Sequence, residues 1–460
     1  GPADLAGTAL ERAFRDAGIG PQNVDLCLAV RLFGDSGPAF PNPFGGPDNL
    51  GAAALARLGA SAQKHIYSHA GGEQPQTFVA EAAKALIDGE AQMVAILGAE
   101  AIANVKAAGR AGASPDWFEA TGVPMEDRGP FAPGPFMVSP QAIAHRIAAP
   151  VYYYALMETA RRAALGESRA AYAQTMGALW EHFAAVAADN PHAAIRTAPS
   201  GADIVTPGSK NPIVTTPYTK AMVARDGVNL GAAILMTTYG HAKALGVKDV
   251  TFLHAHTHAS EPAPITRATF HRAPAQAVVL KTLQDKADMI DLYSCFPIVP
   301  LEAMAELGLN IGDKPITLTG GLPFFGGPGN NYSLHAIAEA HARVRGTAKT
   351  AGIYANGGLS SKHAAGLYGG EPPDALSLRK SDDTPESVTL TTEPNPEGRI
   401  LTYTVEHRRG EPTGVLVVGE TKDGARFYAR GGAERAPEFL EGDPIGETIT
   451  TVTKAGVNGF

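Results

Sequence analysis

The sequence alternates apolar, strand-like runs with segments of helical periodicity in two separate blocks, and this alternation restricts the possible folds more than any other feature. Such a pattern is typical of parallel sheets with helices on their faces. In the first block the predicted elements are helices at 5–17, 52–58 and 76–87 and strands at 24–33, 65–68 and 93–97. In the second block the predicted strands are 228–237, 251–258, 289–293, 316–319 and, as the last, 351–355. The predicted helices of this block are one that ends at residue 245 and three at 273–286, 300–307 and 332–343.

The alternation breaks between the two blocks and again near the C-terminus. After a stretch dense in Pro and Gly, two helices are predicted at 150–165 and 169–189, with Ser168 as the N-cap of the second. From residue 371 a charged linker leads into short alternating strands, the first of them SVTLTT at 387–392. The predicted domains are α/β core halves at 1–103 and 221–370, a helical insertion at 104–220 and a C-terminal all-β domain at 371–460.

Charge and cysteine content narrow the possible partners and compartment. The net charge is −8 and the pI is about 6.0, which argues against a general nucleic-acid binder. No run approaches the roughly 18 apolar residues of a membrane span. Two cysteines, Cys27 and Cys295, form no disulfide framework, so we expect a cytoplasmic protein without nucleic-acid or membrane partners. Because the chain opens on a helix where an α/β unit usually opens on a strand, we expect the native N-terminus to extend further.

The stretch ITLTGGLPFFGGPG at 316–329 is the most unusual segment of the chain. It reads as a buried strand that breaks into two Gly pairs before a helix. Glycines gather at a strand end where the backbone passes close to another group. One reading is a tight connection in an α/β sheet. The other is a loop against a ligand at the carboxyl end of a strand.

Five motifs, in their order and spacing, resemble one known family. They are GAE at 98–100, NP…PYTK within 211–220, VNLGAAI at 228–234, DLYSCF at 291–296 and GGLPFFGGPG at 320–329. Over roughly residues 3–370 the sequence resembles the thiolase superfamily of acyl-CoA acyltransferases, most of all the sterol-carrier-type thiolases and type-1 thiolase-like proteins. The resemblance implies a thiolase fold of two duplicated halves in five αβαβα layers, with a helical loop-domain insertion and an OB-like C-terminal domain. Gly-Gly pairs after a strand in both halves, at 71–72 and 320–321, agree with a duplication.

The resemblance also implies a set of catalytic groups, and this sequence departs from each of them. The family's chemistry uses an acyl-accepting Cys, an activating His, a second acid/base Cys and an oxyanion hole. Ser68 stands at the nucleophile position, and Gly327 replaces the His of the Gly-His-Pro motif. Tyr293-Ser294-Cys295-Phe296 replaces Asn-Glu-Ala-Phe or His-Asp-Cys-Phe, and Ala355-Asn356-Gly357 replaces Cys-X-Gly. The usual thiolysis and condensation cannot run through these residues as in the family.

Several polar residues could refill such a site. The candidate catalytic residues are Ser68, Cys295, His335 and His363, and the candidate residues for binding CoA are Gly71, Gly326, Gly327, Gly329 and Asn330. Each has a plainer reading as well. Ser68 and its neighbour His69 could be a turn cap and a solvated side chain, and Cys295 could be a small core residue. His335 opens a helix, where backbone amides can hold a neutral ring.

His254, His256 and His258 alternate along one predicted strand, so they lie on one face about 7 Å apart. Histidines in this pattern can bind zinc, but Glu261 is the only further ligand type nearby. We therefore favour a structural role and expect no metal.

Two hypotheses follow. In the first, the chain is a thiolase-like acyltransferase that binds CoA or an acyl-CoA as a ligand, with no tightly bound cofactor. In the second, it is a non-catalytic CoA-binding or partner-binding module. Either could be a monomer or a homodimer.

Overall fold

The computed structural model describes residues 1–37, 41–131, 138–147, 149–381, 383 and 385–460. Two five-stranded sheets form the core of the molecule. The first sheet has the order β4-β2-β1-β3-β7, in which β1, β2, β3 and β4 run parallel and β7 is antiparallel to β3. Its strands are β1 Val24–Ala29, β2 Ala62–Tyr67, β3 Met93–Ala101, β4 Glu126–Asp127 and β7 Asn229–Thr237. The helices α1 Pro2–Asp16 and α2 Leu50–Ala56 pack against it.

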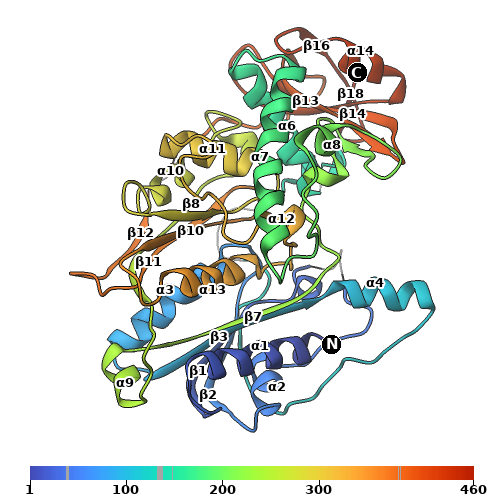
Figure 1. Cartoon of the computed structure of the whole chain (residues 1–460). Coiled ribbons are helices and arrows are strands. Elements are labelled where there is room, and N and C mark those ends of the chain that lie inside the picture. The colour runs from blue at the N-terminus through green and yellow to red at the C-terminus, as the bar shows by residue number, and fades with distance from the viewer. Residues whose placement is uncertain (38–40, 132–137, 148, 382, 384) are drawn as a thin grey trace.

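The second sheet has the order β12-β8-β11-β10-β9, in which β12 is parallel to β8 and β9 is parallel to β10, while β11 is antiparallel to both of its neighbours. The parallel sheet expected for this block is therefore only partly present. Its strands are β8 Phe252–Ser260, β9 Met289–Leu292, β10 Thr350–Gly357, β11 Lys362–Gly369 and β12 Ser377–Ser381. The helices α3 Gln74–Ile87 and α13 Tyr332–Val344 lie between the two sheets and contact both, while α10 Pro274–Leu280 and α11 Ile298–Leu307 pack outside the second sheet (Figure 1). The five αβαβα layers predicted from the sequence are therefore confirmed. The short helix α9, Tyr239–Ala244, connects β7 to β8 at the periphery of the core (Figure 1).

The helices α6, α7 and α8 of the insertion lie with the C-terminal strands at one end of the core, whereas its helix α4 lies beside β7 of the first sheet (Figure 1). The insertion holds α4 Ile102–Ala111, α5 Pro140–Ala144, α6 Pro150–Ala164, α7 Arg169–Asp189, α8 Gly201–Val205, β5 Ile213–Thr215 and β6 Tyr218–Thr219. The C-terminal elements are β13 Glu397–Arg408, β14 Glu411–Glu420, β15 Arg426–Gly431, α14 Ala436–Glu441, β16 Thr448–Thr450, β17 Val452–Lys454 and β18 Val457–Gly459. The third sheet has the order β17-β18-β15-β14-β13-β5-β6, so two strands of the insertion join it. The domain boundaries given above stay a prediction.

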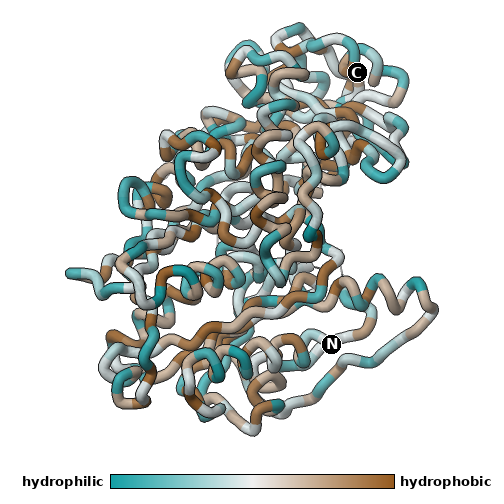
Figure 2. The backbone as a smooth tube through the Cα atoms, in the orientation of Figure 1, coloured by the Kyte–Doolittle hydropathy of each residue, from teal (hydrophilic) through white to brown (hydrophobic). Residues whose placement is uncertain are grey.

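Hydrophobic segments run along the strands of the core, as on β7, and hydrophilic segments lie mainly at the periphery (Figure 2). The largest hydrophobic cluster joins α6 and α7 to the second sheet and to β14 and β15. Through it the insertion and the third sheet are fixed against the end of the core at which the loops of both sheets gather. No helix in the described part of the chain is long and apolar enough to cross a membrane.

The strand predicted at 316–319 is wrong. Backbone amides of Ile290 and Leu292 donate to the carbonyls of Pro315 and Ile316, at 2.8 and 3.0 Å, as a strand would require. The chain then turns away, because one carboxylate oxygen of Asp291 accepts the amides of Leu318 (2.7 Å) and Thr319 (3.0 Å). A buried side chain thus takes the hydrogen bonds that a neighbouring strand would have used.

Three further element predictions are wrong. The strand at 351–355 is not the last of its block, since β11 follows it and pairs with both β10 and β8. The segment SVTLTT is not a strand and makes only isolated bridges at Ser387 and Leu390. The helix predicted to reach residue 286 ends at Leu280.

Candidate functional site

Four loops from the two halves of the core meet at one place, which we call the junction: residues 68–73, 293–297, 320–331 and 356–361. The amide of Gly71 donates to Oδ1 of Asn330 at 2.9 Å, and the Ser333 hydroxyl donates to the carbonyl of Gly72 at 2.6 Å. The Leu322 amide donates to the Ser294 hydroxyl at 3.1 Å. Segments that the sequence analysis singled out separately therefore form one structural unit.

Glycine is required where these loops touch. A Cβ on Gly72 would lie 2.3 Å from the Tyr293 hydroxyl oxygen and 2.5 Å from the carbonyl oxygen of Asn356. Gly320 has φ +105°, and its Cβ would lie 2.4 Å from the Cβ of Ala187 on α7. Such contacts are closer than any side chain tolerates, so the backbone passes there only without one. The reading of the Gly-rich segment as a close-approach loop fits this geometry, and a ligand contact stays a prediction.

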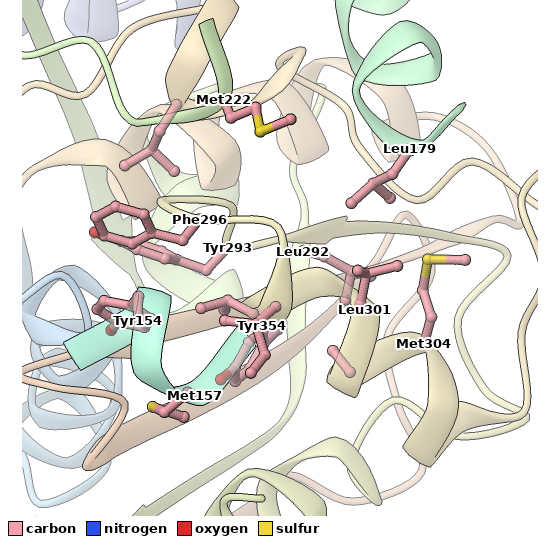
Figure 3. Packing of buried hydrophobic residues seen from close by; sticks show 14 of the residues in the cluster. Tyr154, Met157, Leu179, Met222, Leu292, Tyr293, Phe296, Leu301, Met304 and Tyr354 are labelled. Carbon is pink, nitrogen blue, oxygen red and sulfur yellow. The ribbon is translucent and has the colours of Figure 1, made fainter. Parts of the chain in front are cut away.

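Cys295 lies in an aromatic and amide cluster at the junction. Its Sγ is half-buried and 3.8 Å from Nδ2 of Asn356. The same Nδ2 donates to the Tyr154 hydroxyl at 2.9 Å, and the Tyr154 ring stacks on Phe296 with centroids 4.4 Å apart (Figure 3). Burial raises the pKa of the Cys295 thiol to about 12. Cys295 is therefore a protonated thiol at neutral pH, better suited to giving a proton than to acting as a thiolate nucleophile.

His363, Glu261 and Tyr354 form a buried relay. Nε2 of His363 lies 3.1 Å from Oε1 of Glu261 and 3.0 Å from the carbonyl oxygen of Ser360, while Nδ1 lies 2.8 Å from the Tyr354 hydroxyl. Both partners of Nε2 are acceptors, so we place the ring proton on Nε2 and the Tyr354 hydroxyl donates to Nδ1. Side chains of Glu261 and His363 are 0% exposed. A carboxylate, an imidazole and a phenol in this order can pass a proton along the chain of hydrogen bonds.

Ser68 is placed differently from an activated nucleophile. Its hydroxyl donates to the His69 carbonyl at 2.6 Å and accepts from the Arg31 amide at 2.9 Å. Nε of Arg31 also donates to the Ser68 carbonyl at 2.7 Å. No histidine ring contacts the Ser68 hydroxyl in the described hydrogen bonds, and His69 itself bonds the Gly129 carbonyl. The hydroxyl is held by backbone groups, in the geometry of a turn-stabilising serine.

His335 faces another part of the molecule. It lies on α13 with its ring edge against Phe325, and burial lowers its pKa to about 3. It lines a cavity of about 1530 Å³ between α13 and β7. The four predicted catalytic residues are therefore divided: Cys295 and His363 share the tyrosine and amide cluster, Ser68 is bound to backbone beside it, and His335 points into a separate cavity.

The candidate CoA-binding residues fall on the junction, but Asn330 is fully engaged there. Its Nδ2 donates to the Arg31 carbonyl and to the Ser36 hydroxyl, each at 2.9 Å, while its Oδ1 holds Gly71. Gly326 packs on Val228, and a Cβ on Gly329 would lie 2.5 Å from Oε1 of Glu100. Gly327 has ordinary clearance of 3.4 Å or more. Asn330 thus joins loops, and a role of these residues in CoA binding stays a prediction.

The three alternating histidines occupy β8 as expected. His254 bonds the Glu371 carbonyl at 2.8 Å, and burial lowers the pKa of His256 to about 4. Within the described residues there is no group of three or more His, Cys, Asp or Glu side chains that could hold a metal ion.

The sequence did not predict a role for four residues at or next to the junction. They are Glu73, Asn356 and the two relay partners of His363, Glu261 and Tyr354. Glu73 follows directly after Gly71 and Gly72 at the start of α3, and a charged residue behind a Gly pair is a signal that could have been used. Glu261 directly follows β8 and Tyr354 lies on β10, and neither carries such a signal.

Comparison with solved structures places the fold. The chain superposes on the crystal structure of a monomeric SCP2-thiolase-like protein type 1 from Mycobacterium smegmatis with a TM-score of 0.82 and 28% identity, covering 100% of this chain and 94% of that one. It also matches an Ltp2-ChsH2(DUF35) aldolase with a TM-score of 0.56 and 16% identity, over 80% of this chain and 92% of that one, which shows likeness of fold alone. No protein-family profile and no curated protein matches the chain.

Proposed function

We propose that this chain, a thiolase-like protein, binds coenzyme A or an acyl-CoA thioester at the junction and acts there on the acyl group. The observation that carries the proposal is the convergence of Cys295 and the Glu261–His363–Tyr354 relay on the loops through which the sequence resembles acyl-CoA acyltransferases. The similarity to a thiolase-like protein over the whole chain supports the ligand class. That protein is monomeric, which supports a monomer here as well.

The chemistry that these residues favour is proton transfer at the acyl group rather than formation of an acyl-enzyme on Ser68. Among the residues that the structure describes, the Ser68 hydroxyl has no basic partner, so it remains a poor nucleophile. Cys295 holds a proton that it can give to a carbanion next to a thioester carbonyl. The His363 relay can take up a proton and share the charge with Glu261.

A second candidate function is a non-catalytic binding module. The full engagement of Ser68 and His363 by neighbouring groups favours it, because catalytic hydrogen bonds in ligand-free sites are often looser. On this reading the side chains at the junction hold its shape and the ligand or partner binds without turnover.

A turnover screen with single variants separates the two. Thiolysis, condensation and hydrolysis of acetyl-CoA and of a longer acyl-CoA would be measured for the unmodified chain and for Cys295→Ala, His363→Gln and Ser68→Ala. Turnover that falls at least tenfold in the first two variants and less than threefold in Ser68→Ala is the result expected for the proposal. Binding of CoA without turnover in any chain would favour the non-catalytic module.

A further inference from the structure

Glu73 is a buried carboxyl that no part of the fold explains. It lies where α3 begins and is 0% exposed. One oxygen, Oε1, accepts from Nε2 of Gln74 at 2.7 Å. The other, Oε2, has no hydrogen-bond partner among the residues that the structure describes. A buried oxygen in this state is costly, and such groups persist mainly where they serve a ligand or a reaction.

The free oxygen lies in a cradle made by glycines from two loops. A Cβ on Gly71 would lie 2.1 Å from Oε2, and a Cβ on Gly357 would lie 1.6 Å from the same atom. Either side chain would displace the carboxyl. Two of the four junction loops thus leave room for this one atom, so its position follows from the construction of the site.

The groups facing the carboxyl are polar residues of the junction. Lys362 and His363 lie on β11, Tyr293 follows β9, and Gln74 is the first residue of α3. No ion pair to Glu73 occurs in the described residues, although the charges of Lys362 and His363 act on it. Burial raises the pKa of Glu73 more than those charges lower it. The neutral acid therefore gains population, and its proton makes Oε2 a hydrogen-bond donor.

Around Glu73 the side chains are closely packed, but the rim is partly open. Ala70, Cys295, Gly358 and Lys362 are each partly exposed; the first three belong to three of the junction loops, and Lys362 is the first residue of β11. On β10, Oδ1 of Asn356 also has no partner in the described part of the chain. Two unsatisfied polar atoms next to a partly open rim are what a site for a small polar group requires.

We propose that Glu73, as the neutral acid, is the residue that binds the carbonyl oxygen of the acyl thioester. This inference rests on the proposed function. Oε2 donates a hydrogen bond to that oxygen and draws negative charge onto it. Free CoA and CoA thioethers have no such oxygen, so Glu73 selects for the acylated ligand. It is a substrate-contacting residue distinct from Ser68, Cys295 and His363.

The test compares three ligands by isothermal titration calorimetry on the full chain between about pH 5.5 and 8.5. The ligands are acetyl-CoA, S-ethyl-CoA, in which a methylene replaces the carbonyl, and free CoA. The proteins are the unmodified chain, Glu73→Gln, Glu73→Leu and the control Glu339→Gln. Glu339 is a half-buried carboxyl on α13 whose pKa burial also raises, but its oxygen accepts from Asn190, which is not one of the junction residues.

One hydrogen bond to the carbonyl predicts that the unmodified chain binds acetyl-CoA about five- to tenfold more tightly than S-ethyl-CoA at low pH. This preference should shrink as pH rises and Glu73 loses its proton. Glu73→Gln should keep the preference at every pH, because its amide donates, and Glu73→Leu should lose it at every pH. Glu339→Gln should behave as the unmodified chain.

The outcomes are distinguishable. Binding of all three ligands with equal affinity, or a preference that Glu73→Leu retains, overturns the role of Glu73 and leaves CoA binding intact. Failure of the unmodified chain to bind any of the three overturns the proposed function and the role of Glu73 together.

Discussion

Replacing Asn330 by Ala should loosen the junction, because this one amide joins three segments. The change removes the 2.9 Å bonds to the Gly71 amide, the Arg31 carbonyl and the Ser36 hydroxyl. A buried hydrogen bond contributes about 1 kcal/mol, and a buried group left unpaired costs about 1–3 kcal/mol. Gly71 is buried and Ser36 is half-buried, so water can replace only part of the loss. The expected local cost is about 2–4 kcal/mol.

Hydrogen–deuterium exchange of the 68–73 segment measures this cost directly. Since 1.4 kcal/mol corresponds to a factor of ten, about 2 kcal/mol should speed exchange at Gly71 roughly thirtyfold. Asn330→Asp keeps the acceptor for the Gly71 amide, so its exchange rate at Gly71 should lie between those of the unmodified chain and Asn330→Ala. The control is Asn331→Ala, because neither polar side-chain atom of Asn331 has a partner among the described residues. Equal effects of the two Ala variants, or unchanged exchange in Asn330→Ala, would refute the role given to Asn330.

Three further outcomes are expected. Burial raises the pKa of Glu100 from 4.5 to about 8, so between these pH values the folded chain holds a proton that the unfolded chain releases. The melting temperature should therefore fall as pH rises from 4.5 to about 8. Glu100→Gln should flatten this slope in thermal melts, and an unchanged slope would contradict the assignment. Gly320→Ala forces a side chain against Ala187 at φ +105° and should cost about 2–4 kcal/mol, while Gly327→Ala, with 3.4 Å clearance, should cost less than about 1 kcal/mol in the same melts. His363→Ala leaves Glu261 and the Tyr354 hydroxyl without their ring partner, so it should lower the unfolding free energy by about 2–4 kcal/mol. Ser68→Ala should lower it by only about 1 kcal/mol. The reverse order of the two variants in denaturant titrations would show that Ser68 is the more tightly coupled residue.

Hydrophobic periodicity predicted sheets with helices on their faces, whereas the order of five layers was implied by the family resemblance. The helices at α3 and α13 and the strands at β1, β3 and β7 follow from local pattern. Their alternation predicted the parallel pairing of β1 with β2 and β3, but not the antiparallel pairing of β7 and β11. The strand β11, with the sequence KHAAGLYG, was not predicted, because small residues and glycines carry little strand propensity. Only its pairing with β8 and β10 makes it a strand.

The site was predictable at the level of loops and much less at the level of side chains. The Gly-rich segment and the Gly71 loop were both singled out, and they do meet. Sequence could not show that Arg31 holds the Ser68 loop, that Asp291 turns the chain away from a strand, or that His335 points away from the junction. Each of these depends on a partner distant in the chain. The same holds for Glu261 and Tyr354, which only tertiary structure brings to His363.

Binding of CoA or an acyl-CoA at the junction is tested most directly by a calorimetric titration of the full chain with CoA, acetyl-CoA and a longer acyl-CoA. Thermal melts at saturating ligand would follow. A ligand that binds only the folded chain stabilises it by mass action, about 2.7 kcal/mol at one hundred times its Kd. A CoA site at the junction predicts saturable binding with one site per chain and a matching rise in melting temperature, both reduced in Asn330→Ala. No heat and no shift with any of the three ligands up to millimolar concentration would contradict it, and the thiolase-like fold would then serve another ligand or a protein partner.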